Sequence, residues 1–75
     1  MDITDSIAQG LNHLEKKYGV EFDEIDTWES DEAYEHVTEL IENNPEDEEL
    51  IDLQSNLESV STEDFVLSVE KYSEL

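Results

Sequence analysis

The side chains in this sequence that could do chemistry are its carboxylates. The 75 residues contain 23 Asp and Glu against 3 Lys and Arg, which gives a formal net charge of −20. Fifteen of the acidic residues lie between positions 21 and 52, and no Lys or Arg occurs from position 18 through position 70. Such one-sided charge raises solubility but repels itself in the compact state. We therefore expect the carboxylates to have a use, and the most direct use is to bind something positive.

Catalysis and metal binding find little support in the spacing of these residues. Acid-base catalysis by paired carboxylates needs one of them buried in a cleft with a raised pKa, and a domain this small offers no obvious pocket. The acidic stretch 23–34 fails as a calcium loop, because Trp28 stands at its sixth position instead of Gly and Tyr34 at its twelfth instead of Glu. His13 and His36 have no metal-binding spacing. We predict that the protein is not an enzyme and has no metal ion or cofactor.

Length and composition predict one acidic helical domain, residues 1–75. A chain of this size buries only roughly 60% of the surface that its unfolded form exposes, so its stability is marginal. There is no cysteine to form a disulfide, which leaves dimerisation open. The sequence shows neither a signal peptide nor an apolar run of the ~20 residues that span a membrane. We expect a cytoplasmic protein, located in the host cell cytoplasm if it is viral.

The apolar residues near the N-terminus recur at the spacing of an amphipathic helix. Such a stripe predicts a first helix, which Asp2 or Thr4 can cap and which ends at Gly19. Gly10 lies inside this helix and costs up to about 1 kcal/mol relative to Ala, so either the helix tolerates a weak point or another backbone packs closely there. The stripe consists of Ile3, Ile7, Leu11, Leu14 and Tyr18.

A connector and a second helix are predicted next. Residues 20–28 favour an irregular or one-turn helical connector whose large side chains enter the core. Ser30 is the predicted N-cap of a second helix that ends at about Asn43. The predicted core residues are Phe22, Ile25 and Trp28 in the connector, and Ala33, Val37, Leu40 and Ile41 in the helix, with Tyr34 at its border.

Two further helix starts are marked by turn and cap residues. Asn44 as a cap and Pro45 at the first helical position predict a third helix that begins there. Ser61 and Asp64 have the spacing of a capping box, which predicts a fourth helix from about Thr62. The fold class is therefore all-α, a small bundle of three to four short helices. The predicted core residues are Leu50, Ile51, Leu53, Leu57 and Val60 in the third helix, and Phe65, Val66, Val69 and Tyr72 in the fourth.

The predicted second helix arranges its carboxylates in a row. Residues three or four positions apart lie about 5 to 6 Å from one another on a helix, so a row forms opposite the apolar stripe. Duplex DNA presents one charge per ~3.4 Å along each strand, and the row could approximate a line of phosphates. Trp28 is also predicted to contact the partner, provided that it is exposed, because aromatic residues are enriched at interface hot spots. The predicted partner-binding residues are Asp23, Glu24, Asp26, Trp28, Glu29, Asp31, Glu32, Glu35, Glu39, Glu42, Glu46, Asp47, Glu48, Glu49 and Asp52.

In size and composition the chain resembles the small acidic, phage-encoded DNA mimics that inhibit restriction enzymes, CRISPR effectors and other nucleic-acid-binding proteins. These proteins are not one sequence family, so the resemblance is one of type. It implies an inhibitor that occupies the basic nucleic-acid-binding surface of a nuclease, a CRISPR effector or a DNA-binding regulator. Neither direct binding to nucleic acid nor binding to a membrane is expected.

Other interpretations stay open at this point. An antitoxin, an immunity protein or an acidic regulator that docks on RNA polymerase would bind its protein partner outside the nucleic-acid groove. A halophilic host would also explain an acidic, lysine-poor chain, but it predicts carboxylates all over the surface. Acyl carrier proteins are acidic four-helix domains of similar length, but the only near match to their Asp-Ser-Leu attachment motif is Asp5-Ser6-Ile7, in the first helix instead of the second.

Overall fold

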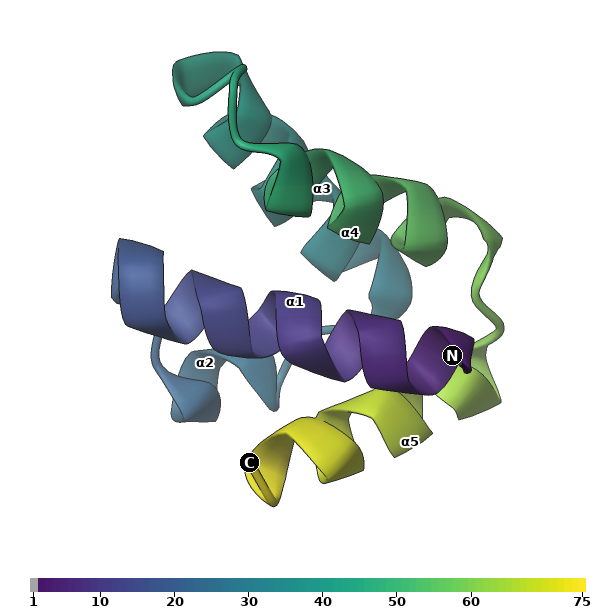
Figure 1. The fold of residues 1–75 in the computed structure, drawn as a ribbon. Coiled ribbons are helices and arrows are strands. Elements are labelled where there is room, and N and C mark those ends of the chain that lie inside the picture. Colours follow the sequence, from purple (N-terminus) through teal and green to yellow (C-terminus); the bar gives the residue numbers. More distant parts are fainter. Residues whose placement is uncertain (1) are drawn as a thin grey trace.

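Five helices, joined by short turns, make up the computed structural model, which describes residues 2–75 (Figure 1). They are α1 (Ile3–Tyr18), α2 (Phe22–Ile25), α3 (Ser30–Asn43), α4 (Glu48–Ser59) and α5 (Thr62–Ser73). No strand occurs in the described part of the chain, so the predicted all-α class is confirmed. The helix count is five instead of three to four because the predicted connector contains the single-turn helix α2. Within residues 2–75, no helix has both the length and the apolar character needed to cross a membrane.

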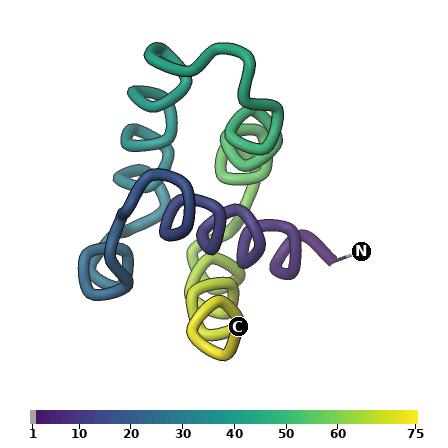
Figure 2. Tube along the Cα trace, turned by 60° about the vertical axis from the view of Figure 1, so that its left-hand side comes forward, coloured from purple at the N-terminus to yellow at the C-terminus, as the bar shows by residue number. Residues whose placement is uncertain are grey.

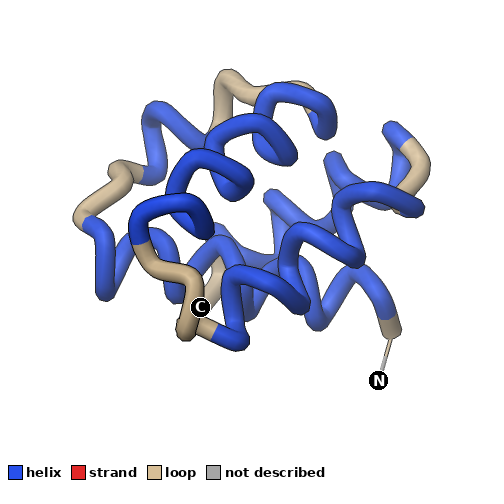
Figure 3. The backbone as a smooth tube through the Cα atoms, turned by 90° about the horizontal axis from the view of Figure 1, so that it is seen from above, coloured by secondary structure: helices blue, strands red, loops and turns tan. Residues whose placement is uncertain are grey.

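The first helix occupies the centre of the molecule. It packs against α5 on one side and against α4 on the other, and α3 packs against α4. Figure 2 shows α3 and α4 side by side above α1, with α5 below it. In Figure 3 almost all of the trace is helical, with only short connecting loops. Because α1 is covered on two sides, its residues Ile7, Leu11 and Leu14 are fully buried.

The predicted boundaries of α1 are confirmed. Gly19 has a φ of 70°, the left-handed conformation that glycine adopts without steric cost. Its N–H donates to the carbonyl of Glu15, and the N–H of Val20 donates to the carbonyl of Leu14. At the other end Asp2 occupies the N-cap position, and its carboxylate accepts a hydrogen bond of 2.9 Å from the Thr4 hydroxyl.

Gly10 lies where α1 meets α4. A methyl carbon added to Gly10 would lie 2.7 Å from Cδ1 and 3.1 Å from Cβ of Leu53. Real Cβ atoms essentially never come within 3.0 Å of another heavy atom, so Leu53 packs against α1 at a distance that only glycine permits. The glycine therefore serves close packing, although its neighbour is a leucine side chain and not a backbone.

The connector and α3 follow the prediction with one shift. Ile25 and Trp28 are buried and Phe22 is half-buried. The N-cap of α3 is Glu29, one residue before the predicted Ser30, and the Glu29 N–H donates to the side chain of Glu32 at 3.2 Å. Within α3 the buried positions are Ala33 and Val37, while Tyr34, Leu40 and Ile41 are half-buried.

The prediction that the next helix begins at Pro45 is wrong, because α4 begins at Glu48. The Asp47 N–H donates to the carbonyl of Asn44 at 3.1 Å, which closes a turn with Pro45 at the second position, where proline is favoured. Asn44 completes the preceding helix instead, since its side-chain amide donates to the carbonyl of Leu40 at 3.0 Å. Asp47 is the N-cap of α4, and its Oδ1 accepts from the Glu49 N–H at 3.1 Å.

The last helix begins at Thr62 as predicted, and Ser61 Oγ accepts a hydrogen bond of 3.2 Å from the Asp64 N–H. Val66 was predicted to be buried and is 52% exposed. Ser68 takes its place in the core, fully buried, with its hydroxyl donating to the carbonyl of Asp64 at 2.7 Å. In α4 likewise, the predicted core residue Ile51 is 43% exposed.

Candidate acidic interface

The carboxylates of α3 lie on the side of the helix that faces away from the core. Ala33 and Val37 define the buried side, and the acidic residues, which are all exposed, occupy the opposite side. At about 1.5 Å per residue, the eleven steps from Asp31 to Glu42 cover about 16 Å of the helix axis. We call this surface the α3 acidic face, and it consists of Asp31, Glu32, Glu35, Glu39 and Glu42.

The acidic residues of α2 adjoin this face across a shallow groove. The groove has a volume of about 180 Å³ and brings Glu24 and Glu39 to one site, although they are fifteen positions apart. Trp28, His36 and Leu40 are among the side chains that line it. The other predicted carboxylates of this part of the chain, Asp23, Asp26 and Glu29, are exposed as well.

Trp28 was predicted to be a partner anchor on the condition that it is exposed, and it is buried in the fold instead. It is only 8% exposed, and its ring stacks on that of His36 with the ring centroids 4.3 Å apart and the planes 11° apart. The stack joins the connector to α3 and fixes the position of the α3 acidic face. No local pattern in the sequence predicts this contact, because it depends on how the chain turns before Ser30.

The acidic residues of α4 form a separate group. Glu46, Glu48, Glu49 and Asp52 are all exposed, as predicted. Glu49 and Asp52 line a groove between α4 and α1, and no residue of α2 or α3 lines that groove. Of the residues that the sequence groups together, Glu49 and Asp52 therefore lie beside α1, whereas Glu24 and Glu39 line a different groove on α2 and α3.

Asp47 was predicted to bind a partner and is instead held inside the protein. It is 8% exposed, and its Oδ2 accepts from His13 Nε2 at 2.9 Å, from Lys17 Nζ at 3.2 Å and from the Tyr18 hydroxyl. Burial by itself would raise the pKa of Asp47, but these three hydrogen bonds outweigh burial and hold the pKa well below its usual range. Asp47 therefore ties the start of α4 to the end of α1, and its buried carboxylate already has three side-chain partners within the fold.

Two of the three lysines form ion pairs with carboxylates of the same chain. Lys17 binds Asp47, as described above, and Lys71 Nζ lies 3.1 Å from Asp5 Oδ1 and 3.7 Å from Asp2 Oδ2. The third, Lys16, lies in the last turn of α1. All three belong to α1 or α5, so α2, α3 and α4 carry no lysine or arginine.

Negative charge also occurs on the other helices: α2 has two carboxylates in four residues, and α4 has four in 12. α1 has two carboxylates in 16 residues, and both have partners in the fold: Asp5 binds Lys71, and Glu15 accepts from the Tyr72 hydroxyl. α5 carries exposed Glu63 and Glu70. By comparison, α3 has five carboxylates in 14 residues, all exposed and none of them in an ion pair with another residue in the range 2–75. Among residues 2–75, α3 therefore carries more exposed carboxylates than any other single helix, ahead of α4, which has four.

Comparison with known proteins does not assign the chain to a group: no protein-family model, no curated protein and no solved structure matches it. Among residues 2–75, no group of three or more potential ligands is placed to hold a metal ion. What the described surface offers chemically is electrostatic: a line of fixed carboxylates that can accept hydrogen bonds and ion pairs from cationic side chains.

Proposed function

We propose that this protein is a non-enzymatic inhibitor that binds a basic nucleic-acid-binding surface of another protein and acts as a DNA mimic. The α3 acidic face is the observation that carries the proposal. Its five carboxylates lie along about 16 Å, an average of one per ~4 Å of helix axis. One strand of duplex DNA presents one charge per ~3.4 Å. The two linear charge densities are close enough for a row of phosphate-binding side chains to engage both.

The fold presents this charge on a fixed frame. The Trp28 and His36 rings stack at one edge of α3, and on its α4 side the Gln54 amide donates to the Thr38 hydroxyl at 3.0 Å. With Ala33 and Val37 fully buried, α3 cannot rotate without exposing its apolar side. A preorganised surface avoids part of the ordering cost of association, and this favours binding by a partner whose Lys and Arg side chains are spaced for phosphates.

In mechanism, the carboxylates take the place of phosphates and no bond is made or broken. Complementary charge speeds association at low ionic strength, and the effect weakens as the screening length falls to about 8 Å near physiological salt. A single exposed ion pair contributes only about 0 to 1 kcal/mol. Affinity should therefore be distributed over many carboxylates and should fall gradually as they are removed.

The test begins with affinity capture of the partner from the native host on the immobilised protein. Duplex DNA is then added to the captured complex at fixed ionic strength. Release of the partner by duplex DNA is the expected result, because the two ligands compete for one site. A partner that holds this protein and duplex DNA simultaneously contradicts the proposal.

A matched pair of variants adds residue-level detail. Glu35→Gln with Glu39→Gln removes two charges from the α3 acidic face, and Glu63→Gln with Glu70→Gln removes the same charge from α5. All four side chains are exposed, so both variants should fold. The α3 pair should lower affinity for the captured partner several-fold more than the α5 pair. Equal losses would show that only the net charge matters.

A second candidate function is an antitoxin, immunity protein or polymerase-docking regulator that binds its partner outside the nucleic-acid groove. The exposure of Val66 (52%) and Leu67 (48%) on α5 favours it, because a few desolvated apolar anchors often dominate the affinity of protein complexes. Leu67→Ser separates the two candidates. A loss of affinity larger than that of the Glu35→Gln, Glu39→Gln pair supports the second one.

A further inference from the structure

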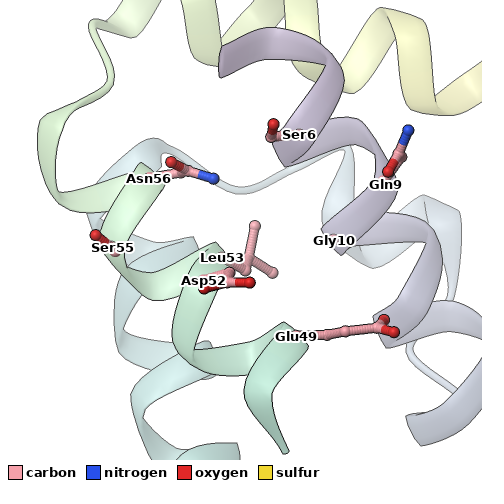
Figure 4. A pocket seen from close by; sticks show the side chains of 8 residues that line it. All are labelled: Ser6, Gln9, Gly10, Glu49, Asp52, Leu53, Ser55 and Asn56. Atoms are coloured by element: carbon pink, nitrogen blue, oxygen red, sulfur yellow. The ribbon is translucent and has the colours of Figure 1, made fainter. Parts of the chain in front are cut away.

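A groove between α1 and α4 has a volume of about 490 Å³ (Figure 4). Gly10 and Leu53 form its floor, where the absence of a side chain at Gly10 lets the two helices approach. Figure 4 shows the Leu53 side chain directed toward Gly10, with Asp52 and Asn56 beside it on α4. Ser6 and Gln9 from α1 and Glu49 and Ser55 from α4 complete the lining.

The polar groups of this groove match a ligand that donates hydrogen bonds. Its lining contains two carboxylates, two side-chain amides and two hydroxyls, and no Lys, Arg or His. A phosphate or another anion would find no cation there. Glu49 is tied to the fold through His13, whose Nδ1 lies 2.8 Å from Glu49 Oε2. Asp52 makes no ion pair with any other residue in the described range, so its carboxylate is available to a ligand.

We propose that this groove binds the guanidinium group of an arginine side chain on a partner protein. Guanidinium has five N–H donors and no acceptor, and its planar fork pairs with a carboxylate through two parallel hydrogen bonds. Asp52 supplies that carboxylate, and the side-chain carbonyls of Asn56 and Gln9 accept further N–H groups. The aliphatic stem of the arginine packs on Leu53, as long basic side chains commonly do on apolar surface. Lysine fits less well, because its ammonium group is compact, has three donors and is more strongly hydrated.

The arginine groove is separate from the α3 acidic face, since no α3 residue lines it. It does not require that the protein mimic DNA. A nucleic-acid-binding protein and a partner that binds outside the nucleic-acid groove could both insert an arginine here. The two proposals can therefore fail independently.

The test is an NMR titration of the full chain with N-acetyl-arginine methylamide, with the citrulline analogue as a neutral control of the same shape. We expect saturable shifts of the side-chain amide signals of Gln9 and Asn56 with the arginine compound and none with the citrulline compound. Asp52→Asn should weaken binding several-fold. Glu63→Gln, which makes the same charge change at an exposed position of α5, should leave it unchanged.

Three results would overturn the proposal. They are chemical-shift changes that never saturate, changes at α3 as large as those in the groove, and equal affinities of the Asp52→Asn and Glu63→Gln variants for the arginine compound. Asn56→Ala provides a second, independent variant, and an unchanged affinity for the arginine compound in both groove variants would also refute the site. If duplex DNA still displaces the captured partner while the arginine test fails, only the groove assignment is lost.

Discussion

Replacing Gly10 with alanine sets two opposing effects against each other. Alanine is favoured over glycine in a helix interior by about 1 kcal/mol, so at an open position this change stabilises a protein. At Gly10 the new methyl group would lie 2.7 Å from Leu53 Cδ1, 3.0 Å from Cγ and 3.1 Å from Cβ. A rotation of the Leu53 side chain moves Cδ1 and Cγ but leaves Cβ in place. Some shift of α4 relative to α1 is therefore required.

Forcing an extra methyl group into a well-packed core costs about 1 to 3 kcal/mol. After the gain in helix propensity is subtracted, Gly10→Ala should lower the free energy of unfolding by roughly 0 to 2 kcal/mol. In a domain of 60 to 100 residues each kcal/mol corresponds to roughly 4 to 8 °C in Tm. We expect the Tm of Gly10→Ala to fall by about 5 °C, although a helix-propensity scale alone predicts a rise of that size.

A double-mutant cycle identifies the cause. Leu53→Ala should cost about 2 to 5 kcal/mol, because Leu53 is 2% exposed and its removal leaves a cavity. In that background Gly10→Ala no longer meets Cγ and Cδ1, and only the 3.1 Å approach to Cβ remains. The variant should therefore cost less than in the wild type, and the gain in helix propensity of up to about 1 kcal/mol can outweigh that cost. The interaction energy of the pair should then be about 1 to 3 kcal/mol. Urea denaturation followed by circular dichroism measures all four free energies.

Two outcomes would refute this reasoning. If Gly10→Ala raises the free energy of unfolding in the wild-type background, α1 and α4 are not in close contact at this position. If the interaction energy is zero, the loss in the single variant does not come from Cγ and Cδ1 of Leu53. Gln9→Ala, an exposed change in the same turn of α1, serves as the control and should alter stability little.

Three further perturbations have definite expected outcomes. Gly19→Ala should lower the free energy of unfolding by about 1 kcal/mol, because a φ of 70° is costly for a residue with a side chain, and an unchanged Tm would contradict the left-handed helix end. At neutral pH Asp47→Ala should destabilise more than Asp47→Asn by about 1 kcal/mol, because asparagine keeps the N-cap of α4 and alanine does not. The folded pKa of Asp47 is depressed, so the stabilisation by its charge is present above the unfolded value of about 3.9 and is lost as the pH falls further. The difference in urea midpoint between wild type and Asp47→Asn should accordingly narrow below about pH 4, and a constant difference would show that the charge has no role. Added NaCl should raise Tm through screening of the repulsion within a net charge of −20, whereas a flat response in a thermal melt would show that repulsion is negligible.

Much of this structure could be predicted from short stretches of sequence. The period of the apolar residues predicts α1, α3 and α5 because a helix places residues three and four apart on one side. Gly19 and Ser61 mark helix ends through bonds to amides and carbonyls within a few residues. The same local geometry predicts that the carboxylates of α3 face outward, since they are interleaved with the buried Ala33 and Val37.

Where the structure differs from the sequence-based prediction, residues far apart in the sequence determine which side chains are buried. In the run Glu46-Asp47-Glu48-Glu49 charge alone does not distinguish one acidic residue from the next. Asp47 alone is buried, and its partners His13, Lys17 and Tyr18 lie some thirty positions earlier. Asp47 did carry one local signal, because aspartate is preferred to glutamate at an N-cap. Trp28 is buried where its ring stacks on His36, and in α5 the small Ser68 is buried while Val66 is exposed.

By itself, then, the sequence determines that the chain is helical and acidic and which side of each helix is apolar, because these properties arise from bonds and spacings within one or two turns. The tertiary structure alone decides how the helices cross. That crossing places Gly10 on Leu53, buries Asp47 and divides the carboxylates between the α3 acidic face and the groove beside α1. The physical reason is that a helix-crossing geometry depends on the shapes of side chains from several helices at once, and no single segment of the chain contains that information.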